Sequence, residues 1–194
     1  MKRNSKMTRR TAETDVTVRL ELDGDGTADV QTGIGFLDHM YTALSKHSGI
    51  NLFVRCSGDL QVDDHHTAED TALVIGAALN EALGERVGIQ RFGDAHVPLD
   101  EALAFAAIDI SGRPFAAIDL NLTRPNIGQI ACENLSHVLS SLAMAARLTL
   151  HVKVLAGIND HHKAEAAFKS VAVALRCAVR QTGEASIPST KGVL

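Results

Sequence analysis

Two stretches of this chain carry the same pattern of potential metal ligands. The first reads Asp-His-His-Thr-Ala-Glu from residue 64, and the second reads Asp-His-His-Lys-Ala-Glu from residue 160. Residues four apart share one face of a helix, so the first histidine and the glutamate of each motif can converge on one ion. The adjacent second histidine is rotated by about 100°, at roughly 3.6 residues per turn, and points elsewhere. Each pair of histidines is therefore better suited to two metal ions than to one.

The two motifs belong to a longer internal repeat. At an offset of 96 residues the histidines and the glutamate of one motif fall on those of the other: His65, His66 and Glu69 on His161, His162 and Glu165. The apolar residues that follow obey the same offset and have the spacing of one helix face. A lone motif of this kind would be read equally well as a polar helix N-terminus, with Asp64 and Asp160 as N-caps. Its preservation in two diverged halves favours metal binding.

The repeat continues upstream at a slightly different offset. At 98 residues the alternating segment 52–55 (LFVR) lies on 150–153 (LHVK), and His39 lies on His137. Both histidines stand in segments with apolar residues at helical spacing. Their matching positions make them further candidate ligands.

Each half thus reads strand, strand, helix, strand, helix. The repeats cover about residues 11–90 and 98–185, and at an offset of 88 Glu13 falls on Glu101. Neither half alone can bury much core, so we expect one α+β domain in which two sheets enclose the helices. Residues 84–99 are expected to connect the halves.

The composition excludes several classes of protein. The net charge of -4, without a basic and aromatic surface segment, argues against nucleic acid as a partner. No apolar run approaches the roughly 20 residues that span a bilayer, so no membrane contact is expected. Residues 1–10 are basic but lead into no apolar segment, which predicts a flexible arm rather than a signal peptide. Three cysteines without a CxxC spacing suit the cytoplasm.

The candidate ligands are the histidines and glutamates that recur at matching places of the two halves: His39, His65, His66, Glu69, His137, His161, His162 and Glu165. Shared between two ions, they supply three imidazoles and one carboxylate to each. A six-coordinate ion would keep open positions for water or substrate, as catalysis requires. Nitrogen and oxygen ligands without thiolate favour Mn, Fe, Co, Ni or Zn, and do not select among them.

The chain also resembles a known family, the imidazoleglycerol-phosphate dehydratases of histidine biosynthesis. The resemblance rests on six motifs in the order of that family: TGIGFLDHM, DDHHTAEDTALVIGAAL, GIQRFG, DISGRP, NDHHKAEAAFKS and IPSTKG. It covers the chain from about residue 8 to the C-terminus. It implies a duplicated fold like that of the second domain of ribosomal protein S5. It also implies two Mn ions per active site and a 24-subunit homo-oligomer with sites between subunits.

The resemblance further implies roles for individual residues. Glu13 falls on the glutamate that contacts the substrate, and the metal ligands implied are the eight named above. The residues on the phosphate side of the substrate are implied to be Arg91, Arg113, Lys169, Ser189, Thr190 and Lys191. A C-terminal tail is often frayed, but residues 186–194 offer hydroxyls and an ammonium without a nearby acid in IPSTKG. We expect this tail to close over the phosphate of the substrate.

A dehydration mechanism fits these residues. The substrate implied is D-erythro-imidazole glycerol phosphate, and the product is imidazole acetol phosphate. Metal binding at the ring nitrogens would favour an imidazolate, whose electron density can expel the hydroxyl group. Glu13 is the candidate base for the carbon-bound proton. The group that protonates the leaving hydroxyl stays open between a metal-bound water and Glu165.

Two other functions would use similar ligands. A two-metal hydrolase would hold its ions about 3.5–4 Å apart to activate water, closer than two ions on either side of an imidazole ring. A structural oligomer or metal store would bind metal without turnover, but would leave the basic, hydroxyl-bearing tail unexplained.

Overall fold

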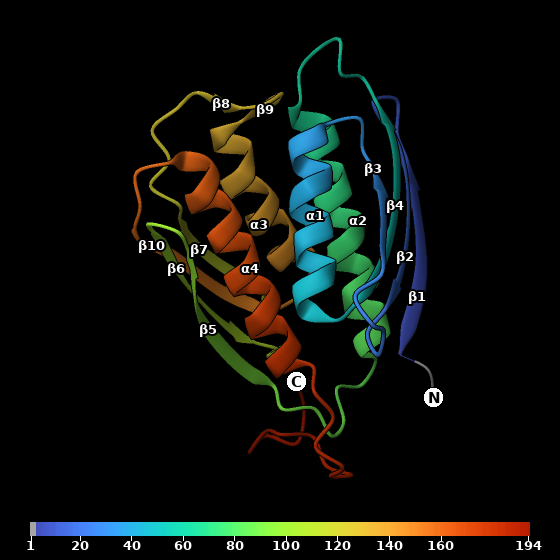
Figure 1. Cartoon of the computed structure of the whole chain (residues 1–194). Helices are drawn as coiled ribbons and strands as arrows, with labels where there is room; N and C mark the ends of the chain where they lie inside the picture. Colours follow the sequence, from blue (N-terminus) through green and yellow to red (C-terminus); the bar gives the residue numbers. More distant parts are fainter. Residues whose placement is uncertain (1–2) are drawn as a thin grey trace.

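The computed structural model describes residues 3–194, in which two four-stranded sheets enclose a layer of four helices (Figure 1). The elements of the first half are β1 (Asn4–Arg10), β2 (Thr14–Glu21), β3 (Ala28–Gln31), α1 (Gly35–Ser48), β4 (Asn51–Gly58) and α2 (His65–Leu83). Those of the second half are β5 (Phe92–Leu99), β6 (Ala102–Asp109), β7 (Phe115–Asp119), α3 (Cys132–Ala146), β10 (Thr149–Ala156) and α4 (Asp160–Ala178). A small hairpin of β8 (Asn126–Ile127) and β9 (Ile130–Ala131) precedes α3.

The two sheets have the same strand order, β1-β2-β4-β3 and β5-β6-β10-β7. Their registers also match, since Val18 pairs with Val54 in the first sheet and Ala106 pairs with Val152 in the second. These pairs are related by the offsets of 88 and 98 residues that the sequence shows. The predicted α+β class, the duplication and the helices between two sheets are confirmed.

The prediction of a flexible arm over residues 1–10 is wrong for Asn4–Arg10, which form β1 at the edge of the first sheet. Residues 1–2 lie outside the described part of the chain. The guanidinium of Arg9 pairs with the carboxylate of Asp70 on α2. Asp70 is almost fully buried. An edge strand with one solvated face can carry many charged residues, so its composition resembled that of a free arm.

The predicted connector likewise contains an edge strand, β5, which takes the place in the second sheet that β1 has in the first. Gly93 faces α4 so closely that an added Cβ would collide with the carbonyl oxygen of Ala174. Glycine therefore allows this strand to pack against the helix backbone. Each half is consequently a βββαβα unit, with one strand more than the sequence predicted.

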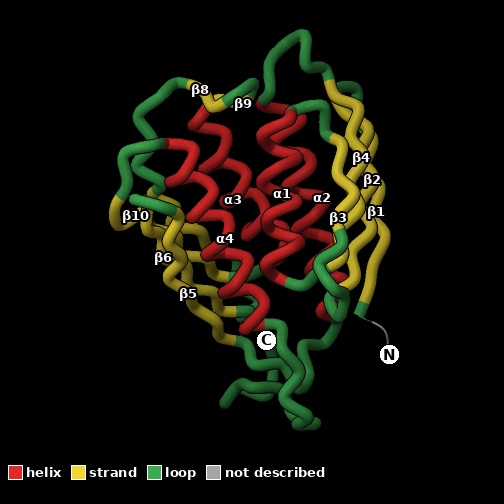
Figure 2. Tube along the Cα trace, in the orientation of Figure 1, coloured by secondary structure: helices red, strands yellow, loops and turns green. Residues whose placement is uncertain are grey.

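The helices pack in two pairs, α2 with α3 and α1 with α4, with α2 on the first sheet and α4 on the second (Figure 1). Gly76 lies against the backbone of α3 at Leu142, where a Cβ would be only 2.5 Å from the carbonyl oxygen. All four helices begin at the same end of the molecule, and the C-terminal segment lies at the opposite end (Figure 2). The first turns of α2 and α4, which carry the histidine motifs, are thereby brought to one end.

The two aspartates predicted as N-caps have other partners. Asp64 stands at the N-cap position of α2, but its side chain caps no N–H of that helix. In α4 the N-cap is Asn159, and Asp160 is the first helical residue. The Asp160 carboxylate instead accepts a hydrogen bond from the backbone N–H of Arg124 at 2.6 Å. It thus holds the long loop of the second half against α4.

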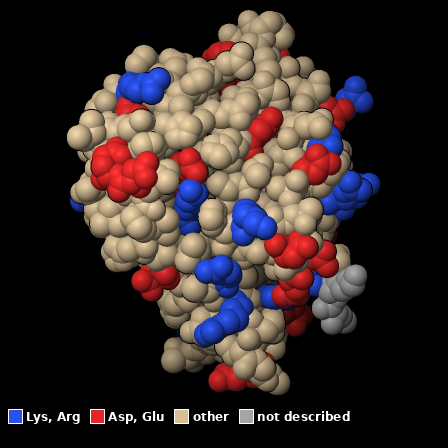
Figure 3. Space-filling view, viewed as in Figure 1, with Lys and Arg blue, Asp and Glu red and all other residues tan. Residues whose placement is uncertain are grey.

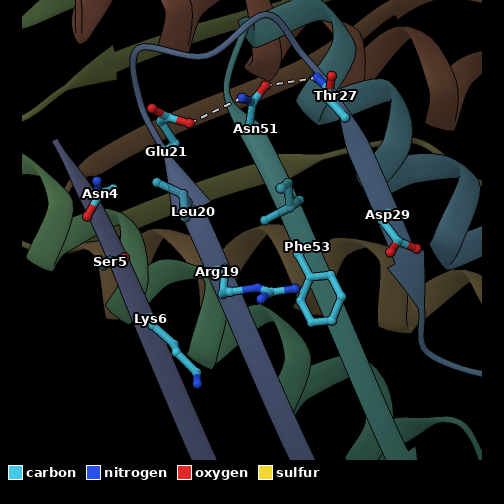
Figure 4. Close-up of a pocket in the computed structure, with 11 residues that line it drawn as sticks. Asn4, Ser5, Lys6, Arg19, Leu20, Glu21, Thr27, Asp29, Asn51 and Phe53 are labelled. Atoms are coloured by element: carbon cyan, nitrogen blue, oxygen red, sulfur yellow. Dashed lines mark hydrogen bonds between the residues drawn. The ribbon is translucent and has the colours of Figure 1, made fainter. Parts of the chain in front are cut away.

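None of the predicted site residues lines the hollow on the outer face of the first sheet. A hollow of about 420 Å³ lies on the outer face of the first sheet, where the Arg19 guanidinium stands 3.9 Å above the ring of Phe53 (Figure 4). Acidic and basic side chains are interspersed over the face seen in Figure 3. Across residues 3–194, no helix has the length and apolar character needed to cross a membrane.

Candidate metal centres

Six of the eight predicted ligands gather into two clusters of three. Site I consists of His65, Glu69 and His137, and site II consists of His39, His161 and Glu165. Within each cluster, one ligand atom of every residue lies within 4.8 Å of the others. Both clusters lie at the end of the molecule where the helices begin.

Site I is formed where α2 packs against α3. Nε2 of His137 lies 3.1 Å from Oε1 of Glu69, and Nε2 of His65 lies 3.8 Å from the other carboxylate oxygen. The imidazoles of His65 and His137 are stacked, with ring centroids 5.0 Å apart. Two nitrogens and a carboxylate therefore face a common point.

Site II repeats this arrangement between α4 and α1. Nε2 of His39 and Nε2 of His161 each lie 3.3 Å from Oε2 of Glu165. The ammonium of Lys169, one turn further along α4, contacts the other carboxylate oxygen at 2.7 Å. Burial opposes ionisation of Glu165, but hydrogen bonds from Lys169 and His39 lower its pKa, which keeps it a carboxylate.

The second histidine of each motif stands apart from its own cluster. Nδ1 of His66 lies 3.0 Å from the carboxylate of Asp59, and its Nε2 lies 3.6 Å from Glu13. Nδ1 of His162 lies 2.7 Å from the carboxylate of Glu101. Adjacent histidines of one helix thus point to different places, in agreement with the rotation that the sequence implies.

These carboxylates change the acid–base properties of the outer histidines. The hydrogen bond with Asp59 raises the pKa of His66, and the one with Glu101 raises the pKa of His162. In return the hydrogen bond with His162, together with backbone N–H groups of Asn159, Glu101 and Ile158, lowers the pKa of Glu101 to about 2. An acceptor at Nδ1 leaves Nε2 free as a ligand atom when the ring is neutral.

Three residues that contact the histidines were not identified from the sequence. They are Asp59, Glu101 and Asn134, whose Oδ1 lies 3.1 Å from Nδ1 of His65. Glu101 had one signal, its position 88 residues after Glu13. Each of the two glutamates lies beside the second histidine of a motif, but Glu13 lies near Nε2 of His66 whereas Glu101 lies near Nδ1 of His162. Asp59 and Asn134 lie in a loop and on a helix whose sequences give no comparable sign.

The predicted phosphate-side residues are divided between the two ends of the molecule. Lys169 lies beside site II, whereas Arg91 donates from its backbone N–H to the carbonyl of Ala178, the last residue of α4. The Arg91 side chain also donates to the carbonyl of Pro188, and Arg113 lies 3.9 Å from Asp109 in the same region. Ser189, Thr190 and Lys191 follow in the C-terminal segment (Figure 2). Since Glu165 and Ala178 are 13 residues apart, the ends are separated by about 20 Å of helix at 1.5 Å per residue.

The donor sets of both sites fit a divalent transition metal. Each cluster offers two imidazole nitrogens and a carboxylate, and within the described residues no cysteine belongs to either. Three protein ligands leave positions open on a tetrahedral or octahedral ion. Fold and clusters together define a duplicated α+β protein with a pair of candidate metal centres.

Comparison with known proteins assigns the family. The family model described as imidazoleglycerol-phosphate dehydratase matches residues 32–175. The chain is 52% identical over 192 residues to the dehydratase of Chlorobium luteolum, covering 99% of this chain and 96% of that protein. It is 56% identical over 171 residues to that of Schizosaccharomyces pombe, covering 88% and 79%. The relative from Phytophthora nicotianae is 55% identical over 192 residues, which are 99% of this chain but only 42% of that longer protein.

Solved structures of dehydratases share the fold. The enzyme of Pyrococcus furiosus, in complex with (S)-C348, has a TM-score of 0.84 and 38% identity, covering 97% of this chain and 100% of that one. The enzyme of Staphylococcus aureus also has a TM-score of 0.84, with 33% identity and coverage of 92% and 99%. The chain belongs to the imidazoleglycerol-phosphate dehydratase family and is therefore a hydro-lyase.

Proposed function

We propose that this enzyme dehydrates D-erythro-imidazole glycerol phosphate to imidazole acetol phosphate in histidine biosynthesis, and that it does so with two Mn ions per active site. The observation that carries the metal dependence is the pair of clusters, which bring six of the eight predicted ligands together. Bound divalent ions would lower the pKa of the substrate's ring N–H, which is the chemistry that the imidazolate route requires.

Glu13 is the base in this proposal. Its side chain is half exposed, and Oε1 lies 3.6 Å from Nε2 of His66. A carboxylate beside a ligand position can reach a carbon-bound proton of a substrate held there. The lowered pKa of Glu165 favours its role as a ligand over its alternative role as the acid that protonates the leaving hydroxyl.

A homo-oligomer with sites between subunits would complete the active site. In one chain the helix starts that carry the clusters lie at one end, and the C-terminal segment lies at the other (Figure 1). Arg91 donates to the carbonyl of Pro188 in that segment, and Arg113 lies 3.9 Å from Asp109, which also pairs with Arg91. A small substrate cannot reach both across about 20 Å of helix. A second copy, placed with its C-terminal end against the clusters, would bring phosphate ligands and metal ligands together. His66 and His162, which point away from their own clusters, would then serve sites shared with neighbouring copies. We propose the 24-subunit assembly for this purpose.

The cytoplasm is the proposed location. All three cysteines are free, and Cys132 is buried as a small apolar side chain. Unpaired thiols of this kind are stable in a reducing compartment.

Turnover of imidazole glycerol phosphate by metal-stripped protein, before and after addition of Mn²⁺, tests the proposal. Activity that appears only with the metal is the expected result. The variant His151→Ala is a matched control, because His151 lies on β10 outside both clusters and should behave as the unsubstituted protein. Stoichiometric metal binding without turnover would contradict the proposed reaction and favour a hydrolase or a metal store.

A further inference from the structure

Site I has a hydrogen-bonded support that passes through three residues. The carboxylate of Asp64 accepts a hydrogen bond from Nδ2 of Asn134 at 2.9 Å. The Oδ1 of Asn134 in turn lies 3.1 Å from Nδ1 of His65. Asn134 is only 5% exposed and belongs to α3, whereas the other two residues stand at the start of α2.

The Asp64 carboxylate decides which way this amide points. A carboxylate only accepts hydrogen bonds, so the NH₂ group of Asn134 must face Asp64 and its carbonyl oxygen must face His65. The same Asp64 oxygen also accepts from the backbone N–H of Ala131 at 2.8 Å, which fixes its position. The orientation of the amide therefore follows from its partners.

The amide in turn selects the tautomer of His65. An acceptor at Nδ1 requires that Nδ1 carries the proton, because the amide oxygen cannot donate. The lone pair of the neutral ring is then on Nε2, the atom that faces Glu69. A hydrogen-bond acceptor on the far side of an imidazole fixes the ring and makes it a better ligand.

Site II lacks this support. The repeat places Phe36 at the position equivalent to Asn134, at the offset of 98 residues. Its ring packs edge-on against His161, with centroids 4.9 Å apart. Among the hydrogen bonds of residues 3–194, none involves Nδ1 of His161, whose ring is thus held by contact without a fixed tautomer.

A second difference between the sites also favours metal binding at site I. The Glu165 carboxylate of site II is held by the ammonium of Lys169 at 2.7 Å, and a metal ion must compete with that charge. The equivalent position in site I, 96 residues earlier, is Leu73, which carries no charge. Site I thus keeps its carboxylate free of a cation at this position.

We infer that Asn134, held by Asp64, is a positioning residue for the metal ligand His65, and that the two pseudo-equivalent sites differ in affinity, with site I filling first. The inference rests on the proposed metal-dependent function. The asymmetry arises from two differences between the halves, Asn134 against Phe36 and Leu73 against Lys169.

Titration of metal-stripped protein with Mn²⁺, followed by the electron paramagnetic resonance signal of the free ion, measures the two affinities directly. The variant His39→Ala removes a ligand of site II and leaves site I to be measured; His137→Ala does the reverse. We expect tighter binding at site I. Equal affinities, or tighter binding at site II, would overturn the inference, while no binding at either site of the unsubstituted chain would contradict the proposed function itself.

The variant Asn134→Leu isolates the positioning role. It should weaken Mn²⁺ binding at site I by about 10- to 100-fold, the usual effect of removing such a partner, and leave site II unchanged. The affinity of site II in the same chain reports that the fold is intact. Equal weakening of both sites, or no change at either, would rule out a positioning role.

Discussion

His137 and Glu69 meet in site I with 3.1 Å between Nε2 and Oε1, although they are 68 residues apart and belong to different halves of the chain. The same crossing occurs in site II, where His39 of the first half meets Glu165 of the second. Each cluster therefore takes a histidine and a glutamate from one half and a histidine from the other. The packing of α2 with α3 and of α1 with α4 is what assembles them.

Removal of a crossing ligand should disable one site only. His137→Ala is expected to weaken Mn²⁺ binding at site I by at least about 100-fold, since a direct ligand contributes more than a supporting residue. Turnover should fall with it if both ions are needed. Equilibrium titration of metal and steady-state kinetics measure the two effects, with His96→Ala on β5 as the control. Metal binding that persists at both sites would contradict the assignment of His137.

Metal binding should depend on pH through the outer histidines. Only a neutral imidazole binds metal, and the carboxylate of Glu101 raises the pKa of His162, so protons compete at a pH above the ordinary value of about 6.5. Glu101→Gln removes that carboxylate and should move the acid limb of Mn²⁺ binding to lower pH. Titrations at several pH values test this, and an unchanged or upward-shifted limb would count against it.

In the metal-free protein, the contact between Glu101 and His162 should stabilise the fold at acidic pH. A histidine whose pKa is raised on folding stabilises the fold below its unfolded pKa of about 6.5, and this contribution is lost as the pH rises through the folded pKa. Glu101→Gln should therefore lower the stability of metal-free protein at acidic pH more than at neutral pH. Urea unfolding at the two pH values measures the difference.

The strand β1 should contribute to stability as an integral part of the fold. Asp70→Asn weakens the contacts that the buried Asp70 carboxylate makes to Arg9 and Thr14, and should lower the free energy of unfolding by about 1–3 kcal/mol. Arg10→Ala is the matched control on the same strand, because its pair with Asp15 is exposed and worth about 0.2–1 kcal/mol. Equal effects of the two substitutions in urea unfolding would mean that β1 is only loosely attached.

Deletion of residues 188–194 should affect the substrate and not the metal. The deletion removes Ser189, Thr190 and Lys191 and the carbonyl of Pro188 that holds Arg91. KM should rise by 10-fold or more if about 1.4 kcal/mol of phosphate binding is lost, or turnover should cease, while the metal content stays the same. Unchanged kinetics would exclude the tail from the active site.

Chelation should change the size of the particle. If metal ligands come from neighbouring copies, removal of the ions takes away contacts between subunits. Analytical ultracentrifugation before and after chelation is expected to show a smaller species that reassembles with Mn²⁺. A particle of unchanged size would mean that metal does not hold the subunits together.

The sequence by itself determined the duplication and the ligand types. Offsets of 96 and 98 residues aligned the histidines and glutamates of the halves, and helical spacing placed His65 with Glu69 and His161 with Glu165. The pairs four residues apart are local, so helical periodicity is sufficient to predict them, and the offsets follow from comparing the two halves. The edge strands β1 and β5 escaped prediction because one face of each is solvated and their composition is that of a loop.

Only the tertiary structure decided which partners each histidine has. His137 joins Glu69 and His39 joins Glu165 because helices distant in sequence pack in these particular pairs. The support of His65 by Asn134, and its replacement at the other site by Phe36, depends on contacts across a helix interface. No local pattern encodes such contacts, since they arise from how two sheets and four helices of residues 3–194 close around one core.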